Sequence, residues 1–358
     1  MTKKKKKSKK VWWIALIVIW SLILAVIVGG YLIFNYYFSM MRRGEDSVEI
    51  LESIPEEQGE LRGEESGRED NFNESGESET DGKINWRSYE DDVYRDPGTY
   101  NLLLVGTDSR EQNMRGRSDA MIIASINKKT NKIVLTSLMR DTYVYIPEVG
   151  DNRLNAAAAY GGIPLLIRTI EANFNIHIDD YMVTNFFVFA DAVDRMGGVD
   201  MWVSAAESEA MRPCIDEYNV LTGEGGGYLP LEDGSYHLNG KQTLAYCRIR
   251  YVGNSDFDRT ERQRETLIKL AEKAKGMSIG EINSIAMAIL PQMTTNMSQS
   301  SCLSLLWEAV TDYKNYEIET FRIPADGTLQ GATVEGMSVL SIDFAKNIDL
   351  FFAKVYNR

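Results

Sequence analysis

The feature that most constrains this chain is an uncharged apolar run near the N-terminus, from Val11 to Phe34. The run contains 24 residues. An α-helix rises about 1.5 Å per residue, so a helix of this length spans the roughly 30 Å hydrocarbon core of a bilayer. A buried core helix would show a polar stripe, and a cleavable signal peptide has an apolar region of only about 7 to 15 residues followed by small residues. We therefore expect an uncleaved transmembrane helix over residues 11–34.

The tail before this run, residues 1–10, contains seven lysines and no acidic residue. Short basic flanks stay in the cytoplasm, so the rest of the chain is expected outside. The sequence thus predicts a single-pass cell-membrane protein with a cytoplasmic N-terminus and an extracellular C-terminal domain. The alternative, a nucleic-acid-binding patch, is less favoured because the lysines abut an apolar segment and are too few to form a DNA-binding domain.

Residues 35–97 are expected to form a disordered acidic linker outside the membrane. Within it, residues 44–92 carry 18 acidic and four basic side chains and few aliphatic ones. Such a segment buries too little apolar surface to offset the entropy of ordering, so we interpret it as a spacer. The remaining domain, residues 98–358, is mildly acidic as well. This balance argues against a nucleic-acid partner and favours small or lipid-borne substrates.

Over residues 98–358, short β-branched apolar runs alternate with segments of helical apolar spacing. This order of elements, in a segment of this length, indicates one large α/β domain. The predicted strands cover residues 100–105, 120–126, 132–137 and 316–323, and the predicted helices cover residues 163–174, 187–196, 241–247, 259–275 and 342–356.

The cysteines Cys214, Cys247 and Cys302 are an odd number and imply no disulfide framework. We interpret them as small buried hydrophobic side chains, with one bridged pair and a free thiol as the alternative. The two histidines, His177 and His237, do not lie at zinc-ligand spacing. This pattern argues against a zinc hydrolase.

Two aspartates lie near the first two predicted strands. Asp108 follows the NLLLVG run, and Asp119 lies just before the next strand. A hairpin-like connection would bring both carboxylates to one end of the sheet. Two hard oxygen ligands suit Mg²⁺, which keeps its other positions for water and substrate phosphate. The alternative is that both are ordinary aspartates of surface loops.

The next candidate residues are three arginines. Arg140 comes directly after the strand over residues 132–137, and Arg248 and Arg250 share one face if their segment is extended. Arginine forks bind phosphate oxygens in a bidentate manner that lysine matches less well. These residues are therefore candidates for holding a phosphate group.

A second basic group lies on the predicted helix over residues 259–275. Arg259, Arg262 and Gln263 are spaced i, i+3 and i+4, so they lie on one side of that helix. A solvated helix face with Glu/Arg pairs is the alternative interpretation. Taken with the two aspartates and with the lack of a Walker loop or a GxSxG motif, the arginines favour pyrophosphate chemistry.

Seven segments, in this order, closely resemble the LytR-CpsA-Psr family: NLLLVGTDSR, GRSDAMIIASIN, SLMRDTYVYIP, RLNAAAAYGG, VDRMGGVDM, HLNGKQTLAYCRIR and DFDRTERQRETL. The resemblance runs from about Tyr100 to Lys269. It implies an α/β fold with a mixed central β-sheet flanked by α-helices, and a hydrophobic pocket for a polyprenyl chain. It also implies the attachment of glycopolymers such as wall teichoic acid or capsular polysaccharide to peptidoglycan.

The resemblance further implies roles for individual residues. Asp108 and Asp119 would bind Mg²⁺. The residues that would hold the substrate pyrophosphate are Arg140, Arg248, Arg250 and Arg259, with Gln263 beside them, Arg117 and Arg262 as neighbours, and Arg153 where a lysine is expected. The catalytic set expected from these is Arg140, Asp141, Arg248 and Arg250.

Three positions near Arg140 qualify this picture. Asp141 is expected to accept a proton or to orient Arg140, with a structural salt bridge as the alternative. Met139 replaces the proline usual before the Arg-Asp pair, and Ala156 stands where histidine is common, so no histidine is expected to handle the acceptor.

The function expected from these observations is a Mg²⁺-dependent phosphotransferase. It would move an anionic glycopolymer of the teichoic acid or capsule type from a polyprenyl-pyrophosphate carrier to peptidoglycan. Two alternatives stay open: a pyrophosphatase that hydrolyses the same carrier, and a membrane-tethered regulatory or sensor protein. The apolar stretches over residues 163–170 and 186–193 are either ordinary core or, in part, the lining of a tunnel for the isoprenoid tail.

Overall fold

The computed structural model describes residues 29–36, 38–44, 92–107, 118–253, 256–298, 300–302, 304–305, 308 and 312–358. Structural statements below refer to these residues. Of the predicted features, residues 11–28 of the apolar run, most of the acidic segment, Asp108 and Arg117 lie outside them.

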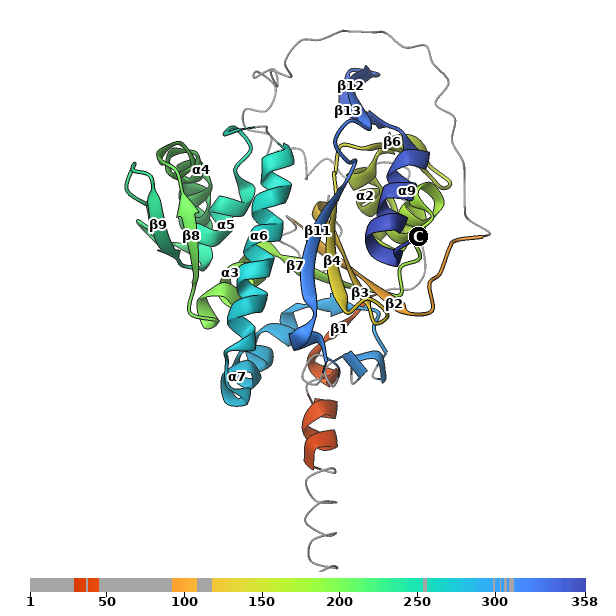
Figure 1. The fold of residues 1–358 in the computed structure, drawn as a ribbon. Coiled ribbons are helices and arrows are strands. Elements are labelled where there is room, and N and C mark those ends of the chain that lie inside the picture. The colour runs from red at the N-terminus through yellow and green to blue at the C-terminus, as the bar shows by residue number, and fades with distance from the viewer. Residues whose placement is uncertain are drawn as a thin grey trace, which may run out of the picture.

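A seven-stranded mixed sheet forms the centre of the domain, in the order β1-β10-β7-β2-β3-β4-β11 (Figure 1). Its strands are β1 (Arg42–Arg43), β2 (Thr99–Thr107), β3 (Ser118–Asn127), β4 (Lys132–Leu138), β7 (Asp180–Asn185), β10 (Thr294–Thr295) and β11 (Glu317–Ile323). Consecutive strands β2, β3 and β4 pair antiparallel, whereas β7 joins β2 and β11 joins β4 in parallel. The C-terminal ends of β2, β4, β7 and β11 therefore lie at the same edge of the sheet, together with the start of β3.

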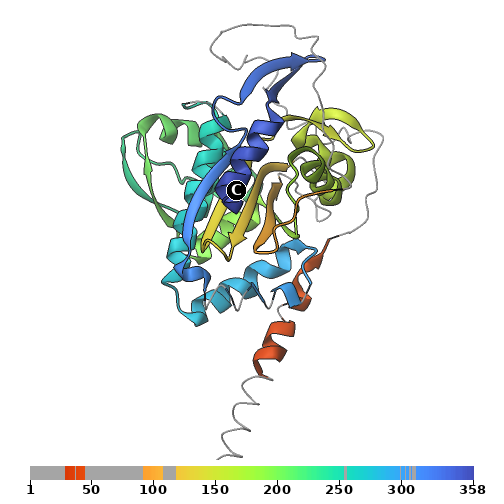
Figure 2. The ribbon, with the colours of Figure 1, turned by 45° about the vertical axis from the view of Figure 1, so that its right-hand side comes forward.

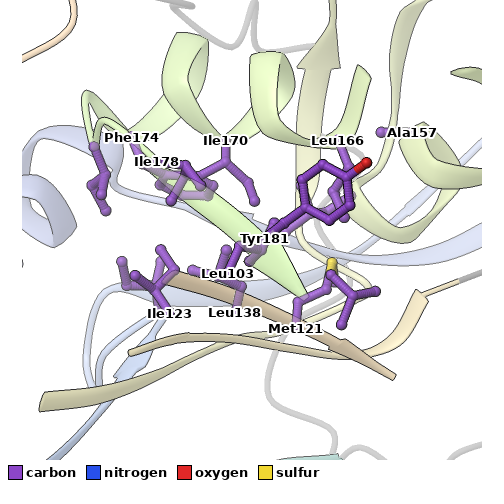
Figure 3. Close-up of a cluster of buried hydrophobic side chains, with 14 of the residues drawn as sticks. Leu103, Met121, Ile123, Leu138, Ala157, Leu166, Ile170, Phe174, Ile178 and Tyr181 are labelled. Carbon is purple, nitrogen blue, oxygen red and sulfur yellow. The ribbon is translucent and has the colours of Figure 1, made fainter. Parts of the chain in front are cut away.

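Helices cover both faces of this sheet. They are α2 (Leu154–Phe174), α9 (Phe344–Tyr356) and α6 (Asp256–Lys275). Figure 3 shows Ile170 and Phe174 of α2 facing Leu103 of β2, in a core cluster to which α9 also contributes. On the other face, Leu267 of α6 packs against Leu135 of β4. With both faces covered, β3 is buried along most of its length, which explains its nearly continuous apolar sequence.

A lobe with its own core lies beside the sheet. It comprises α3 (Phe186–Arg195), β8 (Val199–Val203), α4 (Ala205–Thr222), β9 (Gly234–Leu238) and α5 (Gly240–Arg248). β8 and β9 pair antiparallel, and Met201, Met211 and Leu238 lie in the buried cluster. Capping boxes start both α4, from Ser204, and α5, from Asn239, which defines where the two helices begin.

Two small hairpins and three short helices lie outside the sheet, its covering helices and the lobe. They are β5 (Tyr143–Ile146) with β6 (Gly150–Arg153), β12 (Leu329–Val334) with β13 (Met337–Ile342), α7 (Ile279–Ile289), η2 (Leu290–Gln292) and η3 (Tyr313–Asn315). Figure 2 shows the β12–β13 hairpin projecting from the domain near β5 and β6.

The structure confirms the predicted α/β fold with a mixed central sheet flanked by helices, and all four predicted strands are present as β2, β3, β4 and β11. The predicted helix over residues 163–174 begins earlier, at Leu154. Its first half is rich in alanine, which favours a helix without showing apolar periodicity, and Gly161 and Gly162 break the helical geometry in between. The β12–β13 hairpin was not predicted, and α9 begins at Phe344 because residues 337–342 form β13.

The described N-terminal residues bear on the predicted transmembrane helix and the predicted linker. Residues 29–36 and 38–40 are helical, and the described residues contain no helix long and apolar enough to cross a bilayer. The transmembrane helix stays a prediction. The linker was predicted to begin at residue 35, but Arg42 and Arg43 form β1 and belong to the central sheet.

Candidate active site

The arginine that follows β4 lies directly beside one of the predicted metal ligands. β4 ends at Leu138, and Asp119 is the second residue of β3. Because β3 and β4 are antiparallel neighbours, the end of one strand meets the start of the other. There Nη1 of Arg140 donates a hydrogen bond to Oδ1 of Asp119 over 2.8 Å. The two side chains form a largely buried ion pair at the sheet edge.

Two backbone hydrogen bonds hold the loop that carries Arg140 and Asp141. The amide of Asn155, at the start of α2, donates to the carbonyl of Arg140 over 3.1 Å. The amide of Leu340, in β13, donates to the carbonyl of Asp141 over 2.9 Å. α2 and the β12–β13 hairpin therefore fix the backbone that carries these two side chains.

Asp141 lies between two guanidinium groups. Its Oδ2 is 3.4 Å from Nε of Arg140, and its Oδ1 accepts a hydrogen bond from Nη1 of Arg153 over 3.2 Å. Arg153 ends β6, where it pairs with Tyr143 of β5. The small hairpin thus brings Arg153 to the group, as predicted for a site residue, although its contact is with Asp141.

Two further arginines converge on Asp119. Nη2 of Arg250 lies 3.7 Å from the Asp119 carboxylate. Nη2 of Arg259, in the first turn of α6, donates to the Asp119 backbone carbonyl over 3.4 Å and pairs with Asp256 at 2.7 Å. Residues 119, 140, 250 and 259 come from four different elements, and the structure brings them together as predicted.

Arg248 lies at the side of this group. The segment is not extended there, because Arg248 is the last residue of α5 and Arg250 follows in the next loop. Nη1 of Arg248 pairs with Oε2 of Glu217 at 2.9 Å, and its guanidinium stacks over the ring of Phe186 at 4.7 Å. The pair Arg248 and Arg250 therefore does not share one face in the way an extended segment would allow.

The charges of the group shift one another's protonation. Burial raises the pKa of Asp119, but Arg140, Arg250 and Arg259 outweigh it and lower the pKa below the usual value. Burial, with repulsion from Arg250 and Arg140, lowers the pKa of Arg259 to about 10 despite the nearby Asp256. The guanidinium groups of Arg140, Arg153, Arg250 and Arg259 outnumber the carboxylates of Asp119, Asp141 and Asp256 beside them, and this excess of positive charge suits an anionic ligand.

Arg262 lies apart from the group, contrary to its expected place in the pyrophosphate-binding set. It is 6% exposed, and its Nε donates to Oε1 of Glu207 over 2.8 Å. Its two Nη atoms donate to the carbonyls of Ile249 and Val252, over 3.3 and 3.2 Å. Its donors are directed into the lobe, where they hold the loop that carries Arg250.

Gln263 also has a contact within the protein. Its Nε2 donates to the carbonyl of Cys247 over 3.3 Å, at the end of α5. The side chain thus ties α6 to α5 near Arg248.

Comparison with known proteins places the chain in a family. A family model described as the LytR_cpsA_psr family matches residues 63–349, which is most of the chain. The chain belongs to this family. It is 31% identical over 229 residues to the polyisoprenyl-teichoic acid–peptidoglycan teichoic acid transferase TagT of Bacillus subtilis (strain 168), covering 62% of this chain and 68% of TagT.

Two solved structures extend this likeness of the LytR_cpsA_psr protein to three dimensions. One, described as TagT bound to LI-WTA, has a TM-score of 0.58 and 26% identity and covers 76% of this chain and 96% of that chain. Another, of TagT with bound octaprenyl pyrophosphate lipid, has a TM-score of 0.55 and 23% identity, with the same coverage of 76% and 96%. The second likeness shows a shared fold alone.

Three residues of this LytR_cpsA_psr site were not predicted from the sequence. Asp256 pairs with Arg259 at spacing i, i+3 within α6, a signal that helix spacing makes available. Glu217 and Phe186 contact Arg248 from α4 and α3. No local pattern points to these two, because their approach depends on how the lobe folds.

One of the two predicted magnesium ligands, Asp119, belongs to the described residues. They contain no group of three or more His, Cys, Asp or Glu side chains placed to hold a metal ion. Asp119 contributes one carboxylate, and its expected partner Asp108 lies outside the described residues. Mg²⁺ is commonly bound by one or two carboxylates with water and substrate phosphate, so the chemistry of Asp119 fits such a site.

The apolar stretch over residues 163–170 and two of the cysteines, Cys247 and Cys302, have buried side chains. Leu165, Leu166 and Ile170 are fully buried in the main core. That burial agrees with the interpretation of residues 163–170 as core, while the isoprenoid tunnel stays a prediction. All three cysteines are free thiols, and burial raises the pKa of Cys247 to about 11, as expected for a small buried side chain.

Proposed function

We propose that this LytR_cpsA_psr family protein is a membrane-anchored phosphotransferase that moves an anionic glycopolymer from a polyprenyl-pyrophosphate carrier to peptidoglycan. The observation that carries the proposal is the convergence of Arg140, Arg250 and Arg259 on Asp119. The name of the related transferase TagT and the octaprenyl pyrophosphate lipid described in a TagT structure support the same substrate class.

The arginines have the donors that a pyrophosphate needs. The buried Nε atoms of Arg153 and Arg259 have no hydrogen-bond acceptor among the described residues. A buried donor without an acceptor costs about 1–3 kcal/mol, and a phosphate oxygen would remove that cost. Charge-assisted bonds from guanidinium groups to phosphate are also among the stronger hydrogen bonds in proteins. The group is therefore suited to bind a doubly charged pyrophosphate.

The reaction we propose is an in-line displacement at phosphorus. A hydroxyl of a peptidoglycan sugar attacks the phosphorus that bears the glycan, releasing its proton. The bond from this phosphorus to the bridging oxygen breaks, and polyprenyl phosphate leaves. The arginines neutralise the charge that spreads over the phosphate oxygens in the transition state.

Asp141 is better suited to orient the arginines than to accept a proton. Its carboxylate faces both Arg140 and Arg153, at 3.4 and 3.2 Å. Both carboxylate oxygens already contact a guanidinium group. We therefore propose that Asp141 positions Arg140 and Arg153.

Mg²⁺, if bound by Asp119 together with Asp108, would supply additional positive charge to the pyrophosphate oxygens. The predicted helix over residues 11–34 would keep the domain at the outer surface of the cell membrane, where a polyprenyl carrier resides. Both parts of the proposal are open to direct measurement.

The test uses the full chain, purified in detergent, with a short-chain lipid-pyrophosphate glycan, Mg²⁺ and a peptidoglycan oligomer. We expect glycan covalently attached to the oligomer, detected by mass spectrometry. Arg140→Ala should lower the rate of transfer by about 10²–10³-fold. The control Arg195→Ala changes an exposed arginine that pairs with Asp191 on α3 and should leave transfer unchanged.

The other outcomes decide between the alternatives. Release of polyprenyl phosphate and free glycan phosphate, without attachment to the oligomer, identifies a pyrophosphatase. Binding of the lipid with neither product identifies a sensor, and both results overturn the transfer reaction.

A further inference from the structure

The residues that follow the apolar run are built into the central sheet. β1 (Arg42–Arg43) lies at its edge and pairs in parallel with β10. The amide of Arg42 donates to the carbonyl of Met293 over 3.1 Å, and the amide of Gly44 donates to the carbonyl of Thr295 over 3.0 Å. The guanidinium of Arg43 donates to the carbonyl of Met297. This short segment is therefore held to the domain by both its backbone and a side chain.

Gly44 fits closely against the core at this edge. A Cβ atom added to Gly44 would lie 1.7 Å from Oη of Tyr181. Tyr181 is 3% exposed and belongs to the main core, and its carbonyl accepts a hydrogen bond from Oγ1 of Thr295 over 2.6 Å. The contact between residues 42–44 and the sheet thus depends on the glycine and is specific.

The helix before β1 lies beside α7. The two helices line a shallow groove with Leu32, Ile33, Tyr36, Asn283 and Met287. In Figures 1 and 2 the red N-terminal segment enters the domain at the end that carries α7. α7 has a mostly apolar sequence, and its charged residue, Glu281, caps the start of the helix with Ser278.

Apolar side chains at this end of the molecule are exposed. Leu32, Ile33 and Tyr36 are each more than half exposed, and Ile282 of α7 is 45% exposed. Because Leu32 and Ile33 belong to the end of the predicted transmembrane helix, we define the docking face as Tyr36 together with Ile282 and Met287 of α7. A cluster of exposed large apolar side chains around the exit of a predicted transmembrane helix is typical of a surface that contacts lipid.

We infer that the docking face lies on the lipid bilayer and holds the catalytic domain against the membrane surface. The inference rests on the proposed membrane anchoring. The predicted anchor ends at Phe34 and β1 begins at Arg42, so the connection between them spans at most about 12 Å as a helix. A connection of this length leaves no room for the domain to move far from the bilayer.

The acidic segment therefore does not separate the anchor from the domain, as a spacer would. Residues 45–91 follow Gly44, which is bound to β10, and precede Tyr94, whose amide donates to Oδ1 of Asn175 over 2.6 Å. Both ends of the acidic segment are therefore fixed on the same domain. Its length does not set the distance between the domain and the membrane.

The test measures lipid contact at α7 in the full chain. The three cysteines are replaced by alanine, and Ile282→Cys is labelled with an environment-sensitive fluorophore after reconstitution into phosphatidylcholine and phosphatidylglycerol vesicles that contain brominated lipid. Val220→Cys on α4 is the control, because Val220 is 81% exposed and α4 lies well apart from α7 in Figures 1 and 2. We expect several-fold stronger bromine quenching at position 282. Equal quenching at the two positions would overturn the inference.

A second pair of variants tests the role of β1. Gly44→Leu introduces a side chain into the space of Tyr181 and should detach β1, so quenching at position 282 should fall towards that at 220. Gly225→Leu is the matched control, since nothing lies within 4 Å of its added Cβ. Undiminished quenching in Gly44→Leu would show that β1 does not hold the domain down.

Carbonate extraction of the vesicles distinguishes a failure of the predicted anchor from a failure of the docking face. Protein that stays with the membrane but shows no quenching at 282 overturns the docking face and leaves the anchor intact. Protein released by carbonate overturns the anchor, and with it the docking face.

Discussion

Nη1 of Arg140 and Oδ1 of Asp119, 2.8 Å apart, join the end of β4 to the start of β3. Arg250 and Arg259 approach the same aspartate, so one residue positions three guanidinium groups. Asp119 lies in the sheet and Arg259 in α6, whereas Arg140 and Arg250 lie in the loops that follow β4 and α5. Such preorganised charge is what a transition state with spread negative charge requires.

Replacing Arg140 separates the effect of its charge from that of its shape. Arg140→Ala should lower the rate of glycan transfer by about 10²–10³-fold, because one preorganised donor to the developing charge is lost. Arg140→Lys keeps the charge but loses the planar fork, so we expect an intermediate loss. Transfer kinetics with the short-chain lipid substrate measure both. Equal rates for lysine and arginine would show that charge alone matters at this position.

The lowered pKa of Asp119 predicts an acid-sensitive contribution to stability. A carboxyl group whose pKa is lower in the folded protein stabilises it above the ordinary value of about 3.9, and this stabilisation is lost as the pH falls through the folded-state pKa. Urea unfolding between neutral pH and pH 3 should therefore show a smaller pH dependence in Asp119→Asn than in the parent. Asp326→Asn is the control, since that side chain is 98% exposed. An unchanged pH dependence in Asp119→Asn would contradict the prediction.

Removal of divalent cations should affect activity and stability differently. We expect chelation with EDTA to abolish transfer, and added Mg²⁺ to restore it. The thermal unfolding temperature should change little, because Arg140 and Arg250 already compensate the charge of Asp119. Asp108→Ala should reproduce the loss of activity. Full transfer in the presence of EDTA would remove magnesium from the proposed mechanism.

Arg262 should matter for stability. It forms a buried ion pair with Glu207, and attraction to Arg262 and hydrogen bonds from Ser204 and Arg262 lower the pKa of Glu207 although burial raises it. Removing one partner of such a pair costs about 3–5 kcal/mol, so Arg262→Ala should lower the free energy of unfolding by that amount. Arg195→Ala, on an exposed arginine, should change it by less than about 0.5 kcal/mol. Comparable losses in the two variants would show that the pair contributes little.

The sequence by itself determined the centre of the site. β2, β3 and β4 are consecutive strands with β-branched apolar patterns, and neighbours in sequence tend to pair in the sheet. The alternation of direction then places Asp119 and Arg140 at one edge, without knowledge of the rest of the fold. The position of Arg259 in the first turn of α6 followed from helix spacing in the same way.

Tertiary structure decided the partners that lie far away in the chain. Arg248 and Arg262 look equivalent to Arg250 and Arg259 in the sequence, yet Arg248 pairs with Glu217 of α4 and Arg262 with Glu207. Apolar periodicity and capping residues act over one helix or strand. They do not predict which distant carboxylate will lie beside a given arginine.

The N-terminal segment shows the same limit most clearly. From composition alone, the apolar run and its basic flank predict an anchor, and the acidic segment that follows predicts a spacer. That Arg43 instead contacts Met297, 254 residues later, follows from the free edge that β10 offers and from the space beside Tyr181 that accepts Gly44. Edges and spaces of this kind exist only after the distant segments have packed, so the folded domain alone determines where the chain joins it.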